Sequence, residues 1–387
     1  MEKSDNINQY VDQLKQIHKI LLEFFKNDES QESDLEQVIK FLKGQKINEN
    51  ANDLKLFLHL ISKISNDFHR YNGFFEKIEK ILKSYQEDIQ RNFSNMEIFN
   101  IFKANKRTLL FLFEEKIIIP NIEIFEVITG QKYIENFYPH YFYPEFKDFF
   151  DTELNEKITT LIGSIPPDLF EKNRKIGENY DEVYESIRKN SIDDFTSLIQ
   201  KNNIPLTKEV EPTIFETNPF LLSHSPNLME YATFFGSYEI VKYLYVNKVK
   251  VTPSLWIYSM HCDNPNMIMF LEQNHLKPYD VSYNECLLES IKCHNIDFTS
   301  YIHNNFMKSP PKKDINSQIY KYYNFTCFTG NYDNDQTFYD FCKYDYPHLV
   351  KFLLNTAKIN LNYKKISSSI VFCINVISSF KFVMKFL

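Results

Sequence analysis

A short unit that recurs along the C-terminal half of the chain restricts its fold more than any other feature. Residues 231–244 have the pattern of a short helix, a turn at Gly236 and a second helix with an apolar face. Such recurrence indicates units that pack mainly on their neighbours. The positions that correspond to Leu244 in the other units are Leu198, Leu271, Ile302, Leu353 and Leu387.

Other positions of the unit keep their character as well. Ile240 and Val241 correspond to Met267 and Ile268 in the next unit. The step from Leu353 to Leu387 is about one 33-residue period, and we attribute the irregular interior spacings to insertions. Small residues recur in the first helix, where close packing requires them; they are Ser186, Ala232, Ser259 and Ser290.

The sequence therefore predicts an all-α fold, a helical solenoid of degenerate helix-turn-helix repeats over residues 178–387. Apolar residues also recur at helical spacing up to about Phe113. We expect residues 1–130 to form a helical N-terminal region, and whether it continues the repeats stays open. Residues 131–177 are rich in Tyr, Phe and Pro, and we interpret them as an irregular connector.

These residues carry a resemblance to a known repeat. Residues 231–244 resemble the A-x-x-x-G-x-x-E-I-V-K-x-L core of an ankyrin repeat. The run 171–307 is similar to an ankyrin-like domain of unknown function found in large families of protist proteins. The phrases 214–218, 252–256 and 289–294 carry that match. The resemblance implies ankyrin-type helix pairs and names no activity.

The chain departs from the ankyrin pattern in two places. The histidine of the T-P-L-H tetrad is replaced by Glu230, Ile257, Leu288 and Tyr339. The glycine that closes the second helix is replaced by Lys248, His275 and Phe306. We therefore expect these second helices to end without the left-handed cap that glycine favours.

Composition excludes several classes of protein. With 36 Phe and 25 Tyr among its 387 residues, the chain has enough apolar surface to fold. Its 7 glycines are too scattered to form a phosphate-binding loop. The net charge of −7 is spread along the chain without a basic stripe, so we do not expect nucleic acid as a partner.

The cysteines and the two ends of the chain bear on location. We expect no secretory leader at the charged start, residues 1–6, and predict a cytoplasmic protein with reduced thiols. Residues 370–387 are apolar enough to raise the alternative of a membrane anchor, but Asn375, Lys381 and Lys385 disfavour it. The six cysteines are Cys262, Cys286, Cys293, Cys327, Cys342 and Cys373.

Two clusters could carry chemistry. The pairs His261-Cys262 and Cys293-His294 bring soft ligands together, with Cys262 and Cys293 at equivalent positions of adjacent repeats. They lack the short ligand spacings of zinc sites, so we predict no metal and no other cofactor. The alternative is a thiol enzyme or metal-dependent hydrolase that uses these residues or Cys286. Asp333 and Asp335 lack the other ligands of a calcium loop.

The ankyrin resemblance implies a surface for a partner. The positions just before the turn between the two helices face the concave groove of such repeats. We predict a non-catalytic scaffold or adaptor that holds an unidentified protein there. In the alternative, an inserted loop covers Phe234 and Phe235. Trp256, the single tryptophan, is expected in the core. The predicted partner-binding residues are Phe234, Phe235, His261, Lys292, Lys343 and Tyr344.

Overall fold

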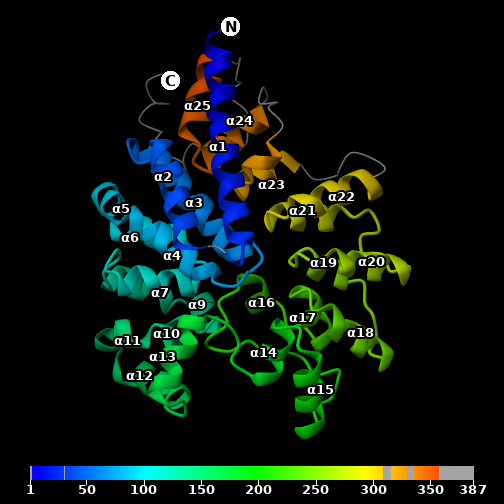
Figure 1. The fold of residues 1–387 in the computed structure, drawn as a ribbon. Coiled ribbons are helices and arrows are strands. Elements are labelled where there is room, and N and C mark those ends of the chain that lie inside the picture. The colour runs from blue at the N-terminus through cyan, green and yellow to red at the C-terminus, as the bar shows by residue number, and fades with distance from the viewer. Residues whose placement is uncertain (1, 30, 308–314, 329–334, 357–387) are drawn as a thin grey trace. The chain divides into compact units, whose positions relative to one another are not determined.

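The described part of the chain is helical throughout. The structure is a computed structural model that describes residues 2–29, 31–307, 315–328 and 335–356. Within these ranges the chain forms α-helices α1 to α25 and two short 3-10 helices, and no strand (Figure 1). A single backbone bridge joins Glu209 to Asn227. The prediction of an all-α fold is confirmed, whereas residues 370–387, Asp333 and Cys373 lie outside the described residues.

Contacts divide the chain into two compact units. Unit 1 takes its residues from Met1–Lys63 and Met307–Leu387, and unit 2 is Ile64–Phe306. The boundary at Lys63 falls inside helix α3 (Ala51–Asp67), so the last turn of that helix belongs to unit 2. The breaks that the sequence suggests near residues 130 and 177 both lie within unit 2.

Unit 1 joins both ends of the sequence. Helix α1 packs on α2 and on the short helix η2, and α24 packs on α23 and α25. His59 stacks on Tyr323 with ring centroids 5.1 Å apart, and Lys55 Nζ lies 2.6 Å from Asp345 Oδ2. Besides α3, its elements are α1 (Glu2–Lys26), α2 (Glu32–Gly44), α23 (Ile315–Lys321), η2 (Phe325–Cys327), α24 (Asp335–Lys343) and α25 (Pro347–Thr356).

The first part of unit 2 is a run of short helices that follow capping side chains. The oxygen of Ser94, Asn105 or Asn121 accepts a hydrogen bond from the backbone N–H three residues later, which satisfies a donor that the helix itself leaves unpaired. Helix α4 packs on α7 through its apolar stripe. The helices are α4 (Phe74–Ser84), α5 (Gln86–Asn92), α6 (Asn95–Phe102), α7 (Lys106–Glu114) and α8 (Ile122–Ile128).

Residues 131–177, interpreted from the sequence as an irregular connector, are also largely helical. Pro139, Pro144 and Pro167 stand in the first two positions of α10, α11 and α13, where proline's missing N–H costs no hydrogen bond. The prolines that suggested irregular chain therefore begin short helices. The elements are α9 (Gln131–Glu135), α10 (Tyr138–Tyr141), α11 (Tyr143–Phe146), η1 (Lys147–Phe149), α12 (Thr152–Ile162) and α13 (Pro167–Ile176).

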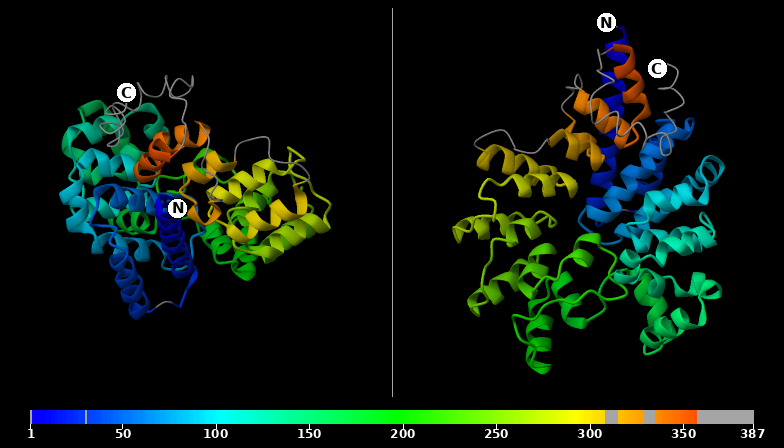
Figure 2. Two further views of the ribbon diagram at one scale, coloured as in Figure 1. Left: turned by 90° about the horizontal axis from the view of Figure 1, so that it is seen from above. Right: turned by 180° about the vertical axis from the view of Figure 1, so that it is seen from behind.

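The remainder of unit 2 contains four helix pairs. Each pair packs on itself, and the first helices α14, α17, α19 and α21 contact one another in that order. Figures 1 and 2 show α17 to α22 as successive layers. The helices are α14 (Glu182–Arg188), α15 (Ile192–Lys201), α16 (Pro219–Ser223), α17 (Leu228–Phe234), α18 (Tyr238–Val246), α19 (Leu255–Ser259), α20 (Pro265–Gln273), α21 (Asn284–Lys292) and α22 (Ile296–Phe306).

The small residues of the first helices lie inside this stack. Ser186, Ala232, Ser259 and Ser290 are all buried. Each of the three serine hydroxyls donates to the carbonyl three residues earlier, so burial leaves no hydroxyl unpaired. Trp256 is fully buried as expected, and its Nε1 donates to the Leu276 carbonyl at 2.9 Å.

A recurring hydrogen bond joins neighbouring pairs. Asn264 Nδ2 donates to the Gly236 carbonyl at 2.8 Å, and Asn295 Nδ2 donates to the Cys262 carbonyl at 2.9 Å. Ser237 Oγ makes the corresponding bond to the Ile187 carbonyl. The three donors follow the turns of successive pairs, so one side chain per pair holds the turn of the pair before it.

The left-handed helix ends correct one expectation. Lys248 has φ +66° and His275 has φ +53°, so these second helices do end in the left-handed conformation, although neither residue is glycine. Phe306 has no positive φ. Gly236, with φ +72°, lies in the turn inside its pair, where a Cβ would come within 3.2 Å of Cys262 Cβ.

Candidate functional site

Three of the predicted partner-binding residues come together in unit 2 at the ends of first helices. Phe234 ends α17, His261 follows α19 and Lys292 ends α21. The rings of Phe234 and His261 stack with centroids 4.7 Å apart. Because each first helix packs on the next, residues in equivalent positions of successive pairs lie side by side.

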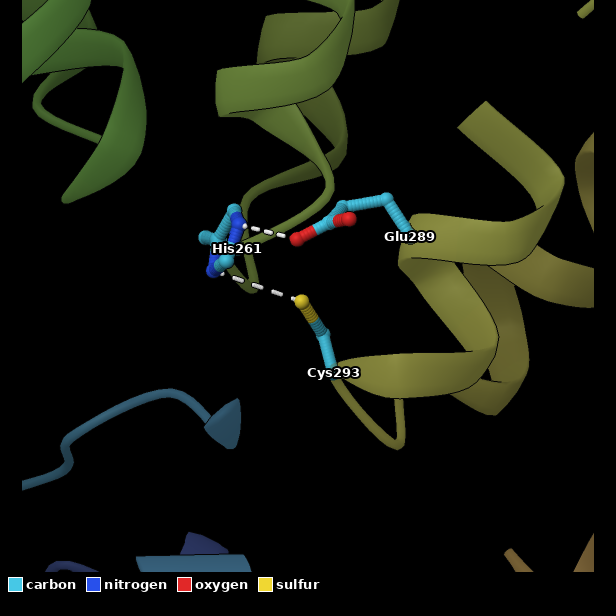
Figure 3. A group of neighbouring side chains, drawn as sticks. All are labelled: His261, Glu289 and Cys293. Carbon is cyan, nitrogen blue, oxygen red and sulfur yellow. Dashed lines mark hydrogen bonds and ion pairs between the residues drawn. The ribbon is translucent and has the colours of Figure 1, made fainter. Parts of the chain in front are cut away.

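A thiol, an imidazole and a carboxylate form the centre of this site (Figure 3). Cys293 Sγ lies 3.3 Å from His261 Nδ1, and His261 Nε2 lies 2.9 Å from Glu289 Oε1. Glu289 and Cys293 stand four residues apart, at the end of α21 and just beyond it, so the helix presents both to the same ring. The two ring nitrogens thus face different partners.

Burial sets the protonation of this group. It lowers the pKa of His261 and raises the pKa of Cys293 well above its usual value, because each charged form would lose its water. Burial also acts to raise the pKa of Glu289, but the contacts with His261 and Lys292 outweigh it and lower that pKa. At neutral pH the thiol and the ring are therefore neutral, and Glu289 is ionised.

Lys292 supplies the balancing charge. Its Nζ lies 2.7 Å from Glu289 Oε1 and 3.7 Å from Asp67 Oδ1, and it lies over the ring of Phe220 at 5.4 Å. Burial acts to lower the pKa of Lys292, but the two carboxylates raise it overall. The ammonium group is therefore held in the charged form between two helices of unit 2.

A segment from outside the helix pairs lies along the same ends. It consists of residues 67–71 and is called the 67–71 segment. His69 Nδ1 donates to the His261 carbonyl at 3.2 Å, and the Tyr71 hydroxyl donates to Asp263. Together with the contact of Asp67 to Lys292, these bonds engage two successive pairs. The chain itself therefore contacts the face that the ankyrin resemblance assigns to a partner.

The insertion between α15 and α17 covers part of this face too. Phe220, on α16, stacks on Phe234 and lies against His261, with ring centroids 5.7 Å and 4.2 Å apart. Phe234 is buried, as is His261 at 3% exposure, whereas Phe235 is partly exposed. The sequence left two alternatives for Phe234: it could face a partner, or an inserted segment could cover it. In the structure the inserted segment covers Phe234.

Two predicted partner-binding residues lie in the other unit. Lys343 ends α24 and is exposed, and Tyr344 follows it and is partly exposed. The ammonium of Lys343 lies 5.1 Å from the ring of Tyr344. These two residues form their own pair in unit 1.

The donor set at the centre suits neither a metal ion nor a reactive thiol. His261, Glu289 and Cys293 offer one nitrogen, one oxygen and one sulfur atom within 4.8 Å of one another. Glu289, however, is already paired with Lys292, and the thiol of Cys293 is protonated and only 2% exposed. A metal would have to displace that proton from an enclosed group, so the donors fit an ion poorly.

The thiol–imidazole–carboxylate order is that of a nucleophile with its base, but the buried protonated thiol lacks activation.

A second buried network involves residues 214–218, one of the stretches that carry the ankyrin resemblance. Arg70 Nη2 donates to Thr217 Oγ1 at 3.1 Å, and Arg70 Nη1 lies 3.8 Å from Glu216 Oε1. Thr217 Oγ1 also donates to the Gly177 carbonyl at 2.7 Å. Sequence reasoning noted residues 214–218 only as a motif and did not select Arg70, Glu289 or Asp67.

Comparison with protein-family models, with curated proteins and with solved structures found no match. None of the helices in the described ranges combines the length and apolar character needed to cross a membrane. The resemblance to ankyrin repeats therefore stays a prediction.

Proposed function

We propose that this chain is a protein-binding module, a scaffold or adaptor built on ankyrin-type helix pairs, and that it makes and breaks no bond itself. The four stacked pairs of unit 2 support this proposal, because such an array places equivalent side chains in rows on a stable frame. Cys262, Cys286, Cys293 and Cys327 are free thiols, which accords with a reducing compartment such as the cytoplasm.

The observation that carries the proposal is a row of exposed apolar side chains on the second helices. Val246 on α18 is 71% exposed and Met269 on α20 is 52% exposed. Tyr245 on α18 is also exposed, and its ring lies 5.3 Å from that of Phe270 on α20, so these helices are neighbours. A tyrosine such as Tyr245 is a side chain that often contributes much of the affinity when a partner buries it, and neighbouring apolar side chains exclude water around it.

This row, formed by Tyr245, Val246 and Met269, is a better test surface than the residues predicted from the sequence. Phe234 and His261 are buried, and Lys292 is held by two carboxylates. Their substitution would disturb folding and binding together. Side chains in the row can be changed with little effect on the fold.

The experiment is affinity purification of the tagged chain from its native cell, with bound proteins identified by mass spectrometry. The test variant carries Tyr245→Ser, Val246→Ser and Met269→Ser. The matched control carries Ile119→Ser and Ile122→Ser, which removes exposed apolar side chains elsewhere in unit 2. We expect a partner that the test variant loses and the control keeps. Equal recovery on both variants would reject the row as the binding surface, and no specific partner on the native chain would reject the module.

A further inference from the structure

Unit 1 contains a hollow that the proposed function does not use. It has a volume of about 370 Å³, within the range of small-molecule sites. All of its lining residues belong to unit 1. They come from α1, the turn between α2 and α3, the first ten residues of α3, η2 and α25.

The floor of the hollow is apolar. Ile17, Phe57, Leu60 and Phe325 line it, and each is buried beneath the surface of unit 1. The free energy falls when an apolar group of a ligand displaces water from such a floor. The body of a ligand would rest there.

The edge of the hollow is polar and centres on Asp53. The Tyr10 hydroxyl donates to Asp53 Oδ1 at 2.8 Å, and His348 Nε2 lies 3.2 Å from the same oxygen. Asn50 Nδ2 lies 3.3 Å from His348 Nε2. Burial and the Asp53 carboxylate raise the pKa of Tyr10, so its hydroxyl stays protonated and remains a donor.

The second carboxylate oxygen of Asp53 is unused. Among the described residues, both contacts of Asp53 go to Oδ1, and none goes to Oδ2. Glu49 adds a second carboxylate to the lining, and Lys46, 3.1 Å from Glu49, offsets one of the two charges. Carboxylates therefore outnumber lysines in the lining of the hollow.

We propose that this hollow binds a small organic cation, an amine with an aromatic or branched aliphatic body. The ammonium group donates to Asp53 Oδ2 at the edge, and the body lies on Phe57 and Leu60. The ring of Tyr10 lines the same edge and adds a face that attracts a cation. An anion would be repelled by the Asp53 carboxylate, and a neutral analogue would bring no positive charge to Oδ2.

The test is isothermal titration calorimetry of the full chain at pH 7 with 2-phenylethylamine, whose amine is then an ammonium ion. We expect a Kd of about 0.1–1 mM, in keeping with so small a ligand. The neutral 2-phenylethanol should bind about tenfold more weakly or worse, because its hydroxyl can donate to the Asp53 carboxylate but brings no positive charge to it. Phenylacetate should not bind.

Two variants locate the site. Asp53→Asn should weaken binding of the amine by about tenfold or more, whereas Glu23→Gln, an exposed carboxylate elsewhere on α1, should leave it unchanged. Leu14→Phe keeps Asp53 and fills part of the hollow, so it should reduce binding of amine and alcohol alike. That variant keeps the test decisive if Asp53→Asn fails to fold.

Three results with the native chain would overturn the proposal. The first is equal affinity for the amine and the alcohol, and the second is preference for phenylacetate. The third is no heat of binding with 2-phenylethylamine up to about 10 mM, well above the expected Kd. Binding that Leu14→Phe leaves unchanged would place the ligand elsewhere and would equally reject this site.

Discussion

Lys292 Nζ lies 3.7 Å from Asp67 Oδ1. This contact joins the last residue of α21 to the last residue of α3, which are far apart in the sequence. Because His69 and Tyr71 bond to the preceding pair, the 67–71 segment occupies the helix ends as a peptide ligand would. A partner that uses this face must displace the segment or bind beside it.

The first prediction concerns the charge of Lys292. Lys292→Met leaves Glu289 and Asp67 without their cation, so the free energy of unfolding should fall by about 1–3 kcal/mol, between the values for exposed and buried pairs. Urea denaturation measures the change. The matched control is Lys242→Met, which breaks the exposed pair with Glu239 at the same spacing and should cost less than about 0.5 kcal/mol. Equal losses in both variants would contradict a special role for Lys292.

The same group predicts a pH dependence. The folded pKa of Glu289 lies below its ordinary value of 4.5, so its contribution to stability is complete above pH 4.5 and is lost as the pH falls through the folded pKa. The stability difference between the native chain and Lys292→Met should therefore shrink below pH 4.5. A stability difference that stays constant down to the acid transition would show that the pairing of Lys292 with Glu289 is not what stabilises the fold.

The sequence predicted the helix pairs better than it predicted the site. Ser259, Ser290 and Trp256 could be assigned to the core because the repeat frame fixes their place on each helix. His261 and Cys293 were noted as soft ligands, but Glu289 was not, although a spacing of four on one helix predicts that it shares a face with Cys293.

Other parts of the site had no local signal. Asp67 contacts Lys292 on α21, and Arg70 contacts Glu216 and Thr217 before α16. One sequence contains no pattern that pairs residues so far apart. The short helices of 131–177 were missed for another reason. Pro139 and Pro144 were taken as breaks, whereas proline is also favoured at the start of a helix.

The second prediction tests the thiol enzyme hypothesis. Burial raises the pKa of Cys262 to about 12 and raises that of Cys293 well above its usual value, so neither should form a thiolate at pH 7. Iodoacetamide should label both slowly in the native chain and fast in urea, and it should label the partly exposed Cys342 before either of them. Peptide mass spectrometry gives the rates. Preferential native labelling of Cys293 would favour the enzyme.

The third prediction concerns the bonds that join neighbouring pairs. Asn264→Ala and Asn295→Ala each remove a donor to a backbone carbonyl of the pair before, so each should lower the free energy of unfolding by about 1–2 kcal/mol. Asn247→Ala serves as control, because its bond to the Tyr243 carbonyl is exposed and local to α18. It should cost less than about 0.5 kcal/mol by urea denaturation. Similar small losses in all three would mean that water replaces these bonds.

The fourth prediction uses backbone conformation. Gly236→Ala places a Cβ 3.1 Å from Asn264 Cβ at a φ of +72°, so it should destabilise the chain by about 1–3 kcal/mol. Lys248→Gly, at φ +66°, should instead raise stability by up to about 1 kcal/mol, because glycine adopts this conformation without strain. Thermal unfolding followed by circular dichroism gives the sign of the stability change in each variant. Destabilisation by Lys248→Gly would show that its side chain contributes more than the strain.

The last prediction concerns Lys106, which is fully buried on α7. Its Nζ donates to the Asn136 and Ile214 carbonyls at 3.0 and 2.9 Å, and burial lowers its pKa to about 7 despite the attraction of Glu216. The unfolded chain therefore binds a proton between pH 7 and 10.5 that the folded chain has released, so stability rises with pH across that window. Lys106→Met should lack this rise. Urea denaturation of both chains at several pH values isolates the effect as a difference, and parallel pH profiles would show that Lys106 stays charged on its two carbonyls.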